Sequence, residues 1–399
     1  MMMHFDKSMD ILNNIEITER RTKRMFIMDA QGFVLAEDII ADHNSPEYPT
    51  SGMDGYALKH ADMALGRLKI ASINPAGSDE KETVQSGECI KTFTGSLMPE
   101  GSDTLIPIEN VTVEDGHIII DEPVPFGFSA REVGENYAKD EKLIRAGSVI
   151  DFPQIGVLAS LNISEVTVYE KPRVAVLSTG SELLDLGEEQ TNDAQIRSSN
   201  NYTIESIVAK YGGDPLHYKC IKDDRETIFD ALSEALEVSD IVVTTGGVSV
   251  GDFDFVKDVI YELGCEIVLR GVRVKPGQHI IIARRANKFI VALPGFAYSS
   301  TIMALVYLVP LMQKLQNGSM TLPKIKATLK EPFVKRARKA EFTACNLSLE
   351  EGRYVVDFEG KKVGTSAILT NMLGTIALAY TSEEASSVDA GQEIDVVIL

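Results

Sequence analysis

The chain has 399 residues, enough for about two to four domains. Its 59 acidic and 39 basic residues give a net charge of −20, which argues against binding to nucleic acids or anionic membranes. No secretory signal opens the chain, and the longest apolar run, 302–312, is too short to span a bilayer, so we expect a cytoplasmic protein. Four scattered cysteines without a CxxC pair indicate neither a zinc site nor a disulfide framework.

The N-terminal third of the chain changes character near residue 44. Residues 9–28 carry apolar positions at helical spacing, which predicts an amphipathic helix leading into a short strand at 34–36. From about 44 to 131 there follow short β-type runs separated by Gly and Pro, among them 68–71, 104–107 and 117–120. We therefore expect a small β-domain inserted between two parts of another domain.

From Arg173 the pattern alternates between strand and helix. The expected strands are 174–177, 241–244 and 289–293, and the expected helices are 199–211, 225–238, 253–263 and 298–315. This order is typical of a doubly wound α/β domain, in which ligands gather beyond the carboxyl ends of the strands. Beyond Pro323 the chain returns to β-type runs, which predict a small C-terminal sheet or barrel.

The loop Thr245–Asp252 follows the second expected strand and is rich in small residues. Such a loop lets backbone N–H groups approach an oxyanion such as a phosphate. The alternative is a tight strand-to-helix connection that needs positive φ angles. The loop matches neither the Walker A pattern nor GxGxxG, which argues against a P-loop or an ordinary dinucleotide fold.

The segment Gly247–Gly251 also fits GxSxG, the nucleophile elbow of α/β-hydrolases, with Ser249 as nucleophile. Only His279 follows it, thirty residues on, and residues 245–247 already break the strand before the serine. Serine hydrolysis therefore stays a minor alternative.

Charged residues accompany the expected strand ends. The carboxylates there are Glu182, Asp223, Asp224, Asp252 and Asp254. Grouped carboxylates can hold Mg²⁺ against a phosphate, although each one alone also suits a helix N-cap. Two basic runs, 270–288 and 335–339, are either solvated faces or sites for a small anion.

Several motifs occur in a characteristic order along nearly the whole chain. They are Ser51–Ala57, Thr94–Gly101, Gly134–Tyr137, Arg173–Leu183, Ser199–Asn200, Asp223–Asp224, Gly246–Asp254, Val274–Gly277 and Leu293–Gly295. This series resembles the molybdopterin molybdenumtransferase family, which includes the corresponding domain of the scaffold protein gephyrin.

The resemblance implies four domains and a homodimer. The linker domain would comprise 1–44 and 132–171, the inserted β-domain 45–131, the α/β molybdopterin-binding domain 172–318 and the C-terminal β-barrel 319–399. Each cleft would lie between the α/β domain of one subunit and the inserted domain of the other. The molybdopterin-adenylylating enzyme is a further candidate partner.

The resemblance also implies the reaction. Family members take adenylyl-molybdopterin and molybdate, use Mg²⁺, and release molybdenum cofactor and AMP. The implied catalytic residues are Glu182, Asp223 and Asp254, with Asp54 and Thr94 reaching the cleft from the partner subunit; Glu182 and Asp223 are the candidate Mg²⁺ ligands. The candidate substrate-binding residues are Thr179, Gly180, Gly246, Gly247, Ser249, Gly251, Lys275, Pro294 and Gly295, with Lys275 helping to bind molybdate.

This chain departs from the family pattern close to the expected anion site. Phe296–Ala297 stands where Asn-Pro is usual, Gln278 replaces a second Lys, and Lys339 an Arg; Asn136 and Gly52 also differ. The intact carboxylates favour a divergent transferase over a paralogue with another oxyanion preference or without efficient insertion. A pterin adenylyltransferase, which needs only the α/β domain, and a non-catalytic scaffold remain alternatives.

Overall fold

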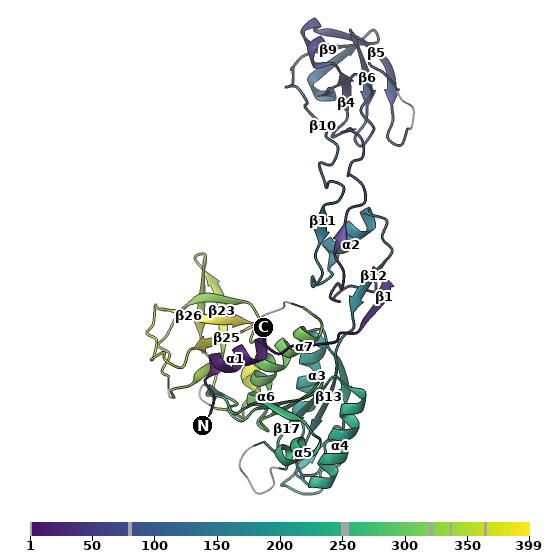
Figure 1. The fold of residues 1–399 in the computed structure, drawn as a ribbon. Helices are drawn as coiled ribbons and strands as arrows, with labels where there is room; N and C mark the ends of the chain where they lie inside the picture. The colour runs from purple at the N-terminus through teal and green to yellow at the C-terminus, as the bar shows by residue number, and fades with distance from the viewer. Residues whose placement is uncertain (1, 79–81, 249–254, 319–321, 336, 363–364) are drawn as a thin grey trace. The chain divides into compact units, whose positions relative to one another are not determined.

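The protein forms two compact units (Figure 1). The computed structural model describes residues 2–78, 82–248, 255–318, 322–335, 337–362 and 365–399. The first unit contains Met1–Ala36, Gly147–Phe152 and Glu165–Leu399, and the second contains Glu37–Ala146 and Pro153–Ser164. The second unit is thus inserted in the sequence of the first, and the four predicted domain boundaries stay a prediction.

The first unit is built on a six-stranded sheet in the order β16-β13-β17-β21-β20-β18. The strands are β13 (Arg173–Ser178), β16 (Asp214–His217), β17 (Ile241–Thr245), β18 (Glu266–Arg270), β20 (Ile281–Arg285) and β21 (Lys288–Leu293). Neighbouring strands pair in parallel from β16 to β21, whereas β20 and β18 pair antiparallel. The predicted α/β fold is confirmed, with three strands at its centre that the sequence identified.

Helices cover both faces of this sheet. They are α1 (Phe5–Asn13), α3 (Asn200–Lys210), α4 (Arg225–Val238), α5 (Val256–Glu262), α6 (Ala297–Met303), the π-helical turn η3 (Ala304–Leu308) and α7 (Val309–Leu315). Alternate residues of a strand point to opposite faces, so Val174 and Val176 pack with α3, α6 and α7, whereas Ala175 and Leu177 pack with α4 and α5. Both faces are buried, as the apolar strands require.

The predicted helix 298–315 forms as one run, α6, η3 and α7. Pro310 lies in the first turn of α7, and proline has no N–H to donate to a preceding helical turn. The wider π turn just before it is the kind of local adjustment that a helix makes around such a residue.

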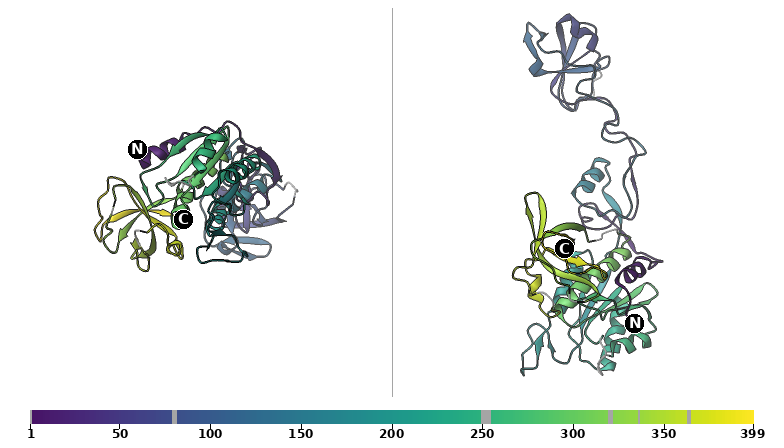
Figure 2. Two further views of the ribbon diagram at one scale, coloured as in Figure 1. Left: turned by 90° about the horizontal axis from the view of Figure 1, so that it is seen from below. Right: turned by 90° about the vertical axis from the view of Figure 1, so that its left-hand side faces the viewer.

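The C-terminal residues form a barrel (Figure 1 and Figure 2). Its strands are β22 (Lys324–Leu329), β23 (Ala340–Glu350), β24 (Arg353–Asp357), β25 (Ala377–Thr381) and β26 (Glu393–Ile398), and the 3-10 turn η4 (Leu369–Met372) connects two of them. They close because β23 pairs with both β24 and β25. A short strand of the α/β region, β19 (Val274–Lys275), adds in parallel to β23. The predicted C-terminal barrel is confirmed.

The second unit holds a six-stranded sheet in the order β7-β4-β6-β5-β9-β8. The strands are β4 (Gly55–Leu58), β5 (Arg67–Asn74), β6 (Glu88–Thr92), β7 (Thr104–Pro107), β8 (Val111–Glu114) and β9 (His117–Ile120), with a 3-10 turn η1 (His60–Leu65). Two short ribbons pair β3 (Thr50–Ser51) with β10 (Ala130–Arg131) and β2 (Ile39–Ile40) with β11 (Lys142–Ile144). Tyr56, Leu68 and Ile106 belong to a core of its own.

One expectation for the N-terminal region was wrong. The helix predicted over 9–28 ends at Asn13, and Thr22–Phe26 forms β1, which pairs antiparallel with β12 (Glu165–Tyr169). The ladder with a strand about 140 residues away in sequence outweighs a local helical pattern whose residues 22–24 are exposed. The strand expected at 34–36 is reduced to isolated bridges at Val34 and Leu35.

Candidate active site

Three neighbouring strands of the α/β sheet end at the same level. Ser178 of β13 lies opposite Thr245 of β17, which lies opposite Leu293 of β21. The pairing continues past the strands, because Thr179 N donates to Thr245 O at 2.9 Å and Gly246 N donates to Leu293 O at 3.1 Å. The loops that begin at Thr179, Gly246 and Pro294 therefore emerge side by side, as the predicted topology requires.

Glycine is needed where these loops touch. Gly246 has φ +96°, and a Cβ there would lie 2.6 Å from the backbone oxygen of Thr179. Gly247 has φ +63°, and its Cβ would lie 2.6 Å from Val256 Cγ2. Gly295 lies close to Gly246, because a Cβ added to Gly295 would be 3.6 Å from the Cα of Gly246. The tight connection with positive φ angles is confirmed at Gly246 and Gly247, and the binding of an oxyanion by this loop stays a prediction.

A buried polar network lies beneath the loops. Ser178 Oγ donates to Asn201 Oδ1 at 2.5 Å and lies 2.6 Å from Thr245 Oγ1. Asn200 Nδ2 donates to Thr245 Oγ1 at 3.1 Å and to Gly295 O at 2.8 Å. The network ties the first turn of α3 to two of the three loops, so the loops have a rigid base.

These loops border a cleft of about 470 Å³. Its lining residues are Thr179, Glu182, Leu183, Ile196, Asn200, Asp223, Thr245, Gly246, Gly247, Val248, His279, Pro294, Gly295 and Phe296. The cleft thus brings together seven of the predicted site residues: Thr179, Glu182, Asp223, Gly246, Gly247, Pro294 and Gly295. The predicted Gly180 follows Thr179 in the chain, and its N–H donates to Ile221 O at 3.0 Å. The predicted residues Ser249, Gly251 and Asp254 lie outside the described residues.

The other seven lining residues were not among the predicted site residues: Leu183, Ile196, Asn200, Thr245, Val248, His279 and Phe296. Asn200 and Leu183 carried a signal, because they belong to the Ser199–Asn200 and Arg173–Leu183 motifs. Leu183 and Ile196 reach the cleft through a parallel pair of two-residue strands, β14 (Leu183–Leu184) and β15 (Ile196–Arg197). Such a short pair leaves no periodic pattern in the sequence.

Comparisons with known proteins agree with this geometry. A family profile described as "MoeA N-terminal region (domain I and II)" matches residues 3–162, and one described as "Probable molybdopterin binding domain" matches 175–314. A molybdopterin molybdenumtransferase of Staphylococcus aureus is 30% identical over 373 residues, covering 92% of this chain and 88% of the relative. The chain belongs to the molybdopterin molybdenumtransferase family. It is therefore a transferase of molybdenum cofactor biosynthesis.

Two further relatives support the membership over the full length. A molybdopterin molybdenumtransferase of Nostoc sp. is 28% identical over 397 residues, covering 96% of this chain and 90% of the relative. The crystal structure of a molybdopterin biosynthesis moeA protein from Pyrococcus horikoshii is 25% identical, with a TM-score of 0.85 and full coverage of both chains. Within the described residues, no helix is long and apolar enough to cross a membrane.

Two residues that the family pattern assigns to the cleft lie in the second unit. Thr94 donates to Asp54 Oδ1 from its backbone N at 2.8 Å and from its Oγ1 at 2.7 Å. These two hydrogen bonds lower the pKa of Asp54 below its usual value. Asp54 and Thr94 thus form one exposed pair with an ionised carboxylate, and their action on a cleft stays a prediction.

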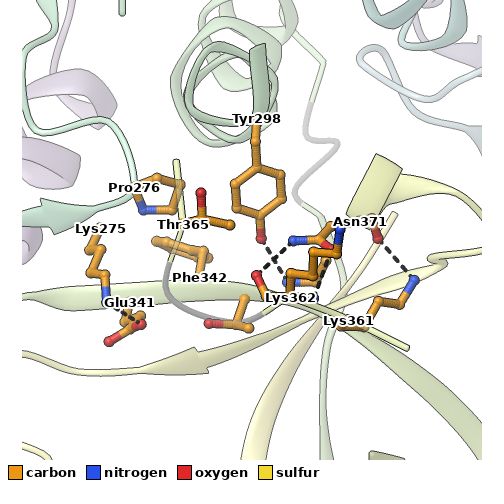
Figure 3. A pocket seen from close by; sticks show the side chains of 11 residues that line it. Lys275, Pro276, Tyr298, Glu341, Phe342, Lys361, Lys362, Thr365 and Asn371 are labelled. Carbon is orange, nitrogen blue, oxygen red and sulfur yellow. Dashed lines mark hydrogen bonds and ion pairs between the residues drawn. The ribbon is translucent and has the colours of Figure 1, made fainter. Parts of the chain in front are cut away.

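Lys275 lies apart from the cleft lining, in a small cavity at the junction of the α/β region and the barrel (Figure 3). Its Nζ lies 3.1 Å from Glu341 Oε1, and the Glu341 side chain is only 4% exposed. Lys361, on another wall, donates to Asn371 O at 2.9 Å and to Thr375 Oγ1 at 2.6 Å. The charge of Lys275 is therefore already balanced in this structure, and its contact with molybdate stays a prediction.

Several other basic residues of the two runs also make structural contacts. Arg273 Nε pairs with Glu383 at 3.1 Å, and Arg285 pairs with the exposed Glu237 at 3.0 Å. Lys288 donates to the carbonyls of Leu236 and Glu237 in the last turn of α4, where a cation is favourable. Lys339 donates to Gln278 Oε1. These contacts favour the structural interpretation of the runs over a broad anion site.

Proposed function

We propose that the chain inserts molybdate into adenylyl-molybdopterin in the presence of Mg²⁺ and releases molybdenum cofactor and AMP. One observation carries the proposal: the cleft at the strand ends joins two carboxylates, Glu182 and Asp223, to loops of bare backbone. A substrate with bridging phosphates needs both features, because the backbone N–H groups bind its oxygens and carboxylates can hold a metal against them.

The loops supply the donors for the anion. Gly246 and Gly247 allow close approach to their backbone, and Thr179 adds a hydroxyl whose buried Oγ1 has no hydrogen-bond partner among the described residues. A buried hydroxyl without a partner is costly, and a phosphate oxygen in the cleft would satisfy it. Thr179, Gly246 and Gly247 would thus orient the phosphates of adenylyl-molybdopterin.

Glu182 and Asp223 fit the needs of Mg²⁺. This ion is usually held by one or two protein carboxylates, with phosphate oxygens and waters completing its shell. Among the described residues, no group of three or more His, Cys, Asp or Glu could hold a metal ion. When bound, Mg²⁺ would neutralise phosphate charge, while a carboxylate would orient the water that releases AMP.

The remaining parts of the proposal concern assembly and location. The Asp54–Thr94 pair would complete the cleft of a partner subunit in a cytoplasmic homodimer, and the molybdopterin-adenylylating enzyme would supply the substrate. The acidic charge of the chain supports small-molecule handling rather than nucleic-acid binding. Lys275 would meet molybdate by exchanging its contact with Glu341.

The test is a direct insertion assay. Purified protein is incubated with adenylyl-molybdopterin, Mg²⁺ and either molybdate or tungstate, and AMP release and metal incorporation are followed. We expect AMP and incorporated metal in equal amounts. No AMP under any condition would overturn the transferase proposal, and formation of the adenylylated pterin from ATP would instead support a pterin adenylyltransferase.

A further inference from the structure

Phe296 is a large apolar side chain left open at the cleft. It lines the cleft and is 64% exposed. Among the described residues its ring makes no aromatic or cation–π contact, whereas Phe5, Phe33, Phe289, Phe333 and Phe342 each make at least one. An exposed aromatic ring that borders a binding cleft is a common sign of contact with a ligand.

The position of Phe296 is fixed from both sides. It is the N-cap residue of α6, and its carbonyl accepts a hydrogen bond from Ser300 N at 2.9 Å. The preceding Gly295 is held by Asn200, whose Nδ2 donates to its carbonyl at 2.8 Å. The backbone that carries the ring therefore belongs to the same rigid base as the cleft loops, so little order has to be gained on binding.

The lining divides into an apolar and a polar part. Ile196, 55% exposed, joins Phe296 as an apolar lining residue, whereas Glu182 and Asp223 are acidic and Thr179 offers a hydroxyl donor. An apolar flat surface beside an anion-binding loop suits a ligand that is a planar ring at one end and a phosphate at the other.

We propose that Phe296 is a stacking platform for a planar heteroaromatic ring of the substrate. The inference rests on the proposed function, because adenylyl-molybdopterin carries two such rings, adenine and the pterin. Stacking on one aromatic side chain changes affinity by roughly ten-fold.

The absence of tryptophan from the chain allows a direct test. Phe296→Trp places a single tryptophan at the cleft, and AMP or pterin-6-carboxylate is titrated in separate experiments. We expect saturable quenching of its emission by the compound whose ring stacks. Phe152→Trp, at a position that is 76% exposed and outside the cleft lining, is the matched control and should show only weak, non-saturable quenching.

Affinities measured by calorimetry on ring variants complete the test. Phe296→Ala and Phe296→Leu should weaken the Kd of the stacking compound roughly ten-fold, and Phe296→Tyr should retain it, because a ring rather than apolar area is required. The inference is wrong if Phe296→Ala binds both compounds like the wild type, or if it changes only the oligomeric mass, which would place the ring in a subunit contact.

These outcomes are separate from the insertion assay. Insertion with an unchanged KM for adenylyl-molybdopterin in Phe296→Ala would remove the stacking role and leave the proposed function intact. Saturable stacking of AMP or of the pterin in a protein without insertion activity would support the stacking role and overturn the proposed function.

Discussion

The cleft at the strand ends and the junction around Lys275 differ in the surroundings of their charged side chains. In the cleft, Glu182 is exposed, Asp223 is half-buried, and the Thr179 hydroxyl has no partner among the described residues. At the junction, Lys275 is paired with the buried Glu341. We predict that the polar groups of the cleft act on a ligand, whereas the Lys275–Glu341 pair joins the α/β layer to the barrel, although Glu341 Oε2 is likewise buried without a hydrogen-bond partner among the described residues.

The sharpest test of this difference compares two adjacent carboxylates. Asp223→Ala, like Glu182→Ala, should lower insertion by at least about 100-fold while the protein stays folded, because each removes a group that orients metal or water. The neighbouring Asp224 is the N-cap of α4, and its Oδ1 accepts from Thr227 N at 2.9 Å. Asp224→Ala should therefore keep activity and lower the Tm slightly. Full insertion in both Asp223→Ala and Glu182→Ala would remove them from the mechanism.

The tightness of the cleft is tested at Gly246. Gly246→Ala and Gly32→Ala both introduce a Cβ at positive φ, which costs about 1–2 kcal/mol, but only at Gly246 does the new atom meet the Thr179 oxygen. We expect Gly246→Ala to lose about 1–3 kcal/mol more of unfolding free energy than Gly32→Ala, measured by urea denaturation, and to lose insertion activity. Equal losses in the two variants would contradict the close approach of the loops.

At the junction the expected effect is mainly on stability. Lys275→Ala should lower the free energy of unfolding by about 3 kcal/mol, because Glu341 would stay buried without its cation. The double variant Lys275→Met with Glu341→Leu should recover most of that loss. If this stable double variant still has a raised KM for molybdate, Lys275 also binds the oxyanion; an unchanged KM would leave it a structural role only.

The smallest expected effect is a pH dependence of stability at His217, the last residue of β16. His217 lies 2.7 Å from Glu205 and 3.5 Å from Asp185; burial lowers the pKa of His217, but the two carboxylates outweigh this and raise it. Its folded-state pKa exceeds its unfolded value, so its stabilisation is complete below about pH 6.5 and disappears as the pH rises through the folded pKa. His217→Gln should lower the Tm at about pH 5.5 and leave it unchanged near pH 9; parallel Tm profiles would contradict the coupling.

The sequence predicted the centre of the site better than its edges. Residues 173–183, 241–247 and 293–295 combine an apolar run with a small-residue loop, and such local signals identify both strand and strand end. Antiparallel β18 and β20 and the Pro-containing β16 were missed, because basic residues in the first two and Pro215 in the third weaken the strand pattern.

The ion pair between Lys275 and Glu341 could not be predicted from the sequence, for a different reason. Lys275 and Glu341 are 66 positions apart, and nothing local shows that β19 joins β23 and brings them within 3.1 Å. Glu182 was easier, because it follows soon after β13, whose neighbours in a parallel sheet are restricted, and Asp223 was identified through the Asp223–Asp224 motif. Long-range pairing through the barrel carries no such restriction.

An aromatic cluster joins the N-terminal helix α1 to the C-terminal barrel, and this affects how the chain folds. Phe5 of α1 packs against Phe342 of β23, with ring centroids 5.4 Å apart, and against Tyr380 of β25 at 5.9 Å. The aromatic cluster thus draws on both chain ends, and neither the α/β layer nor the barrel can bury it alone. The two should melt in a single calorimetric transition, so separating the chain near residue 319 would give two fragments that aggregate rather than two stable domains.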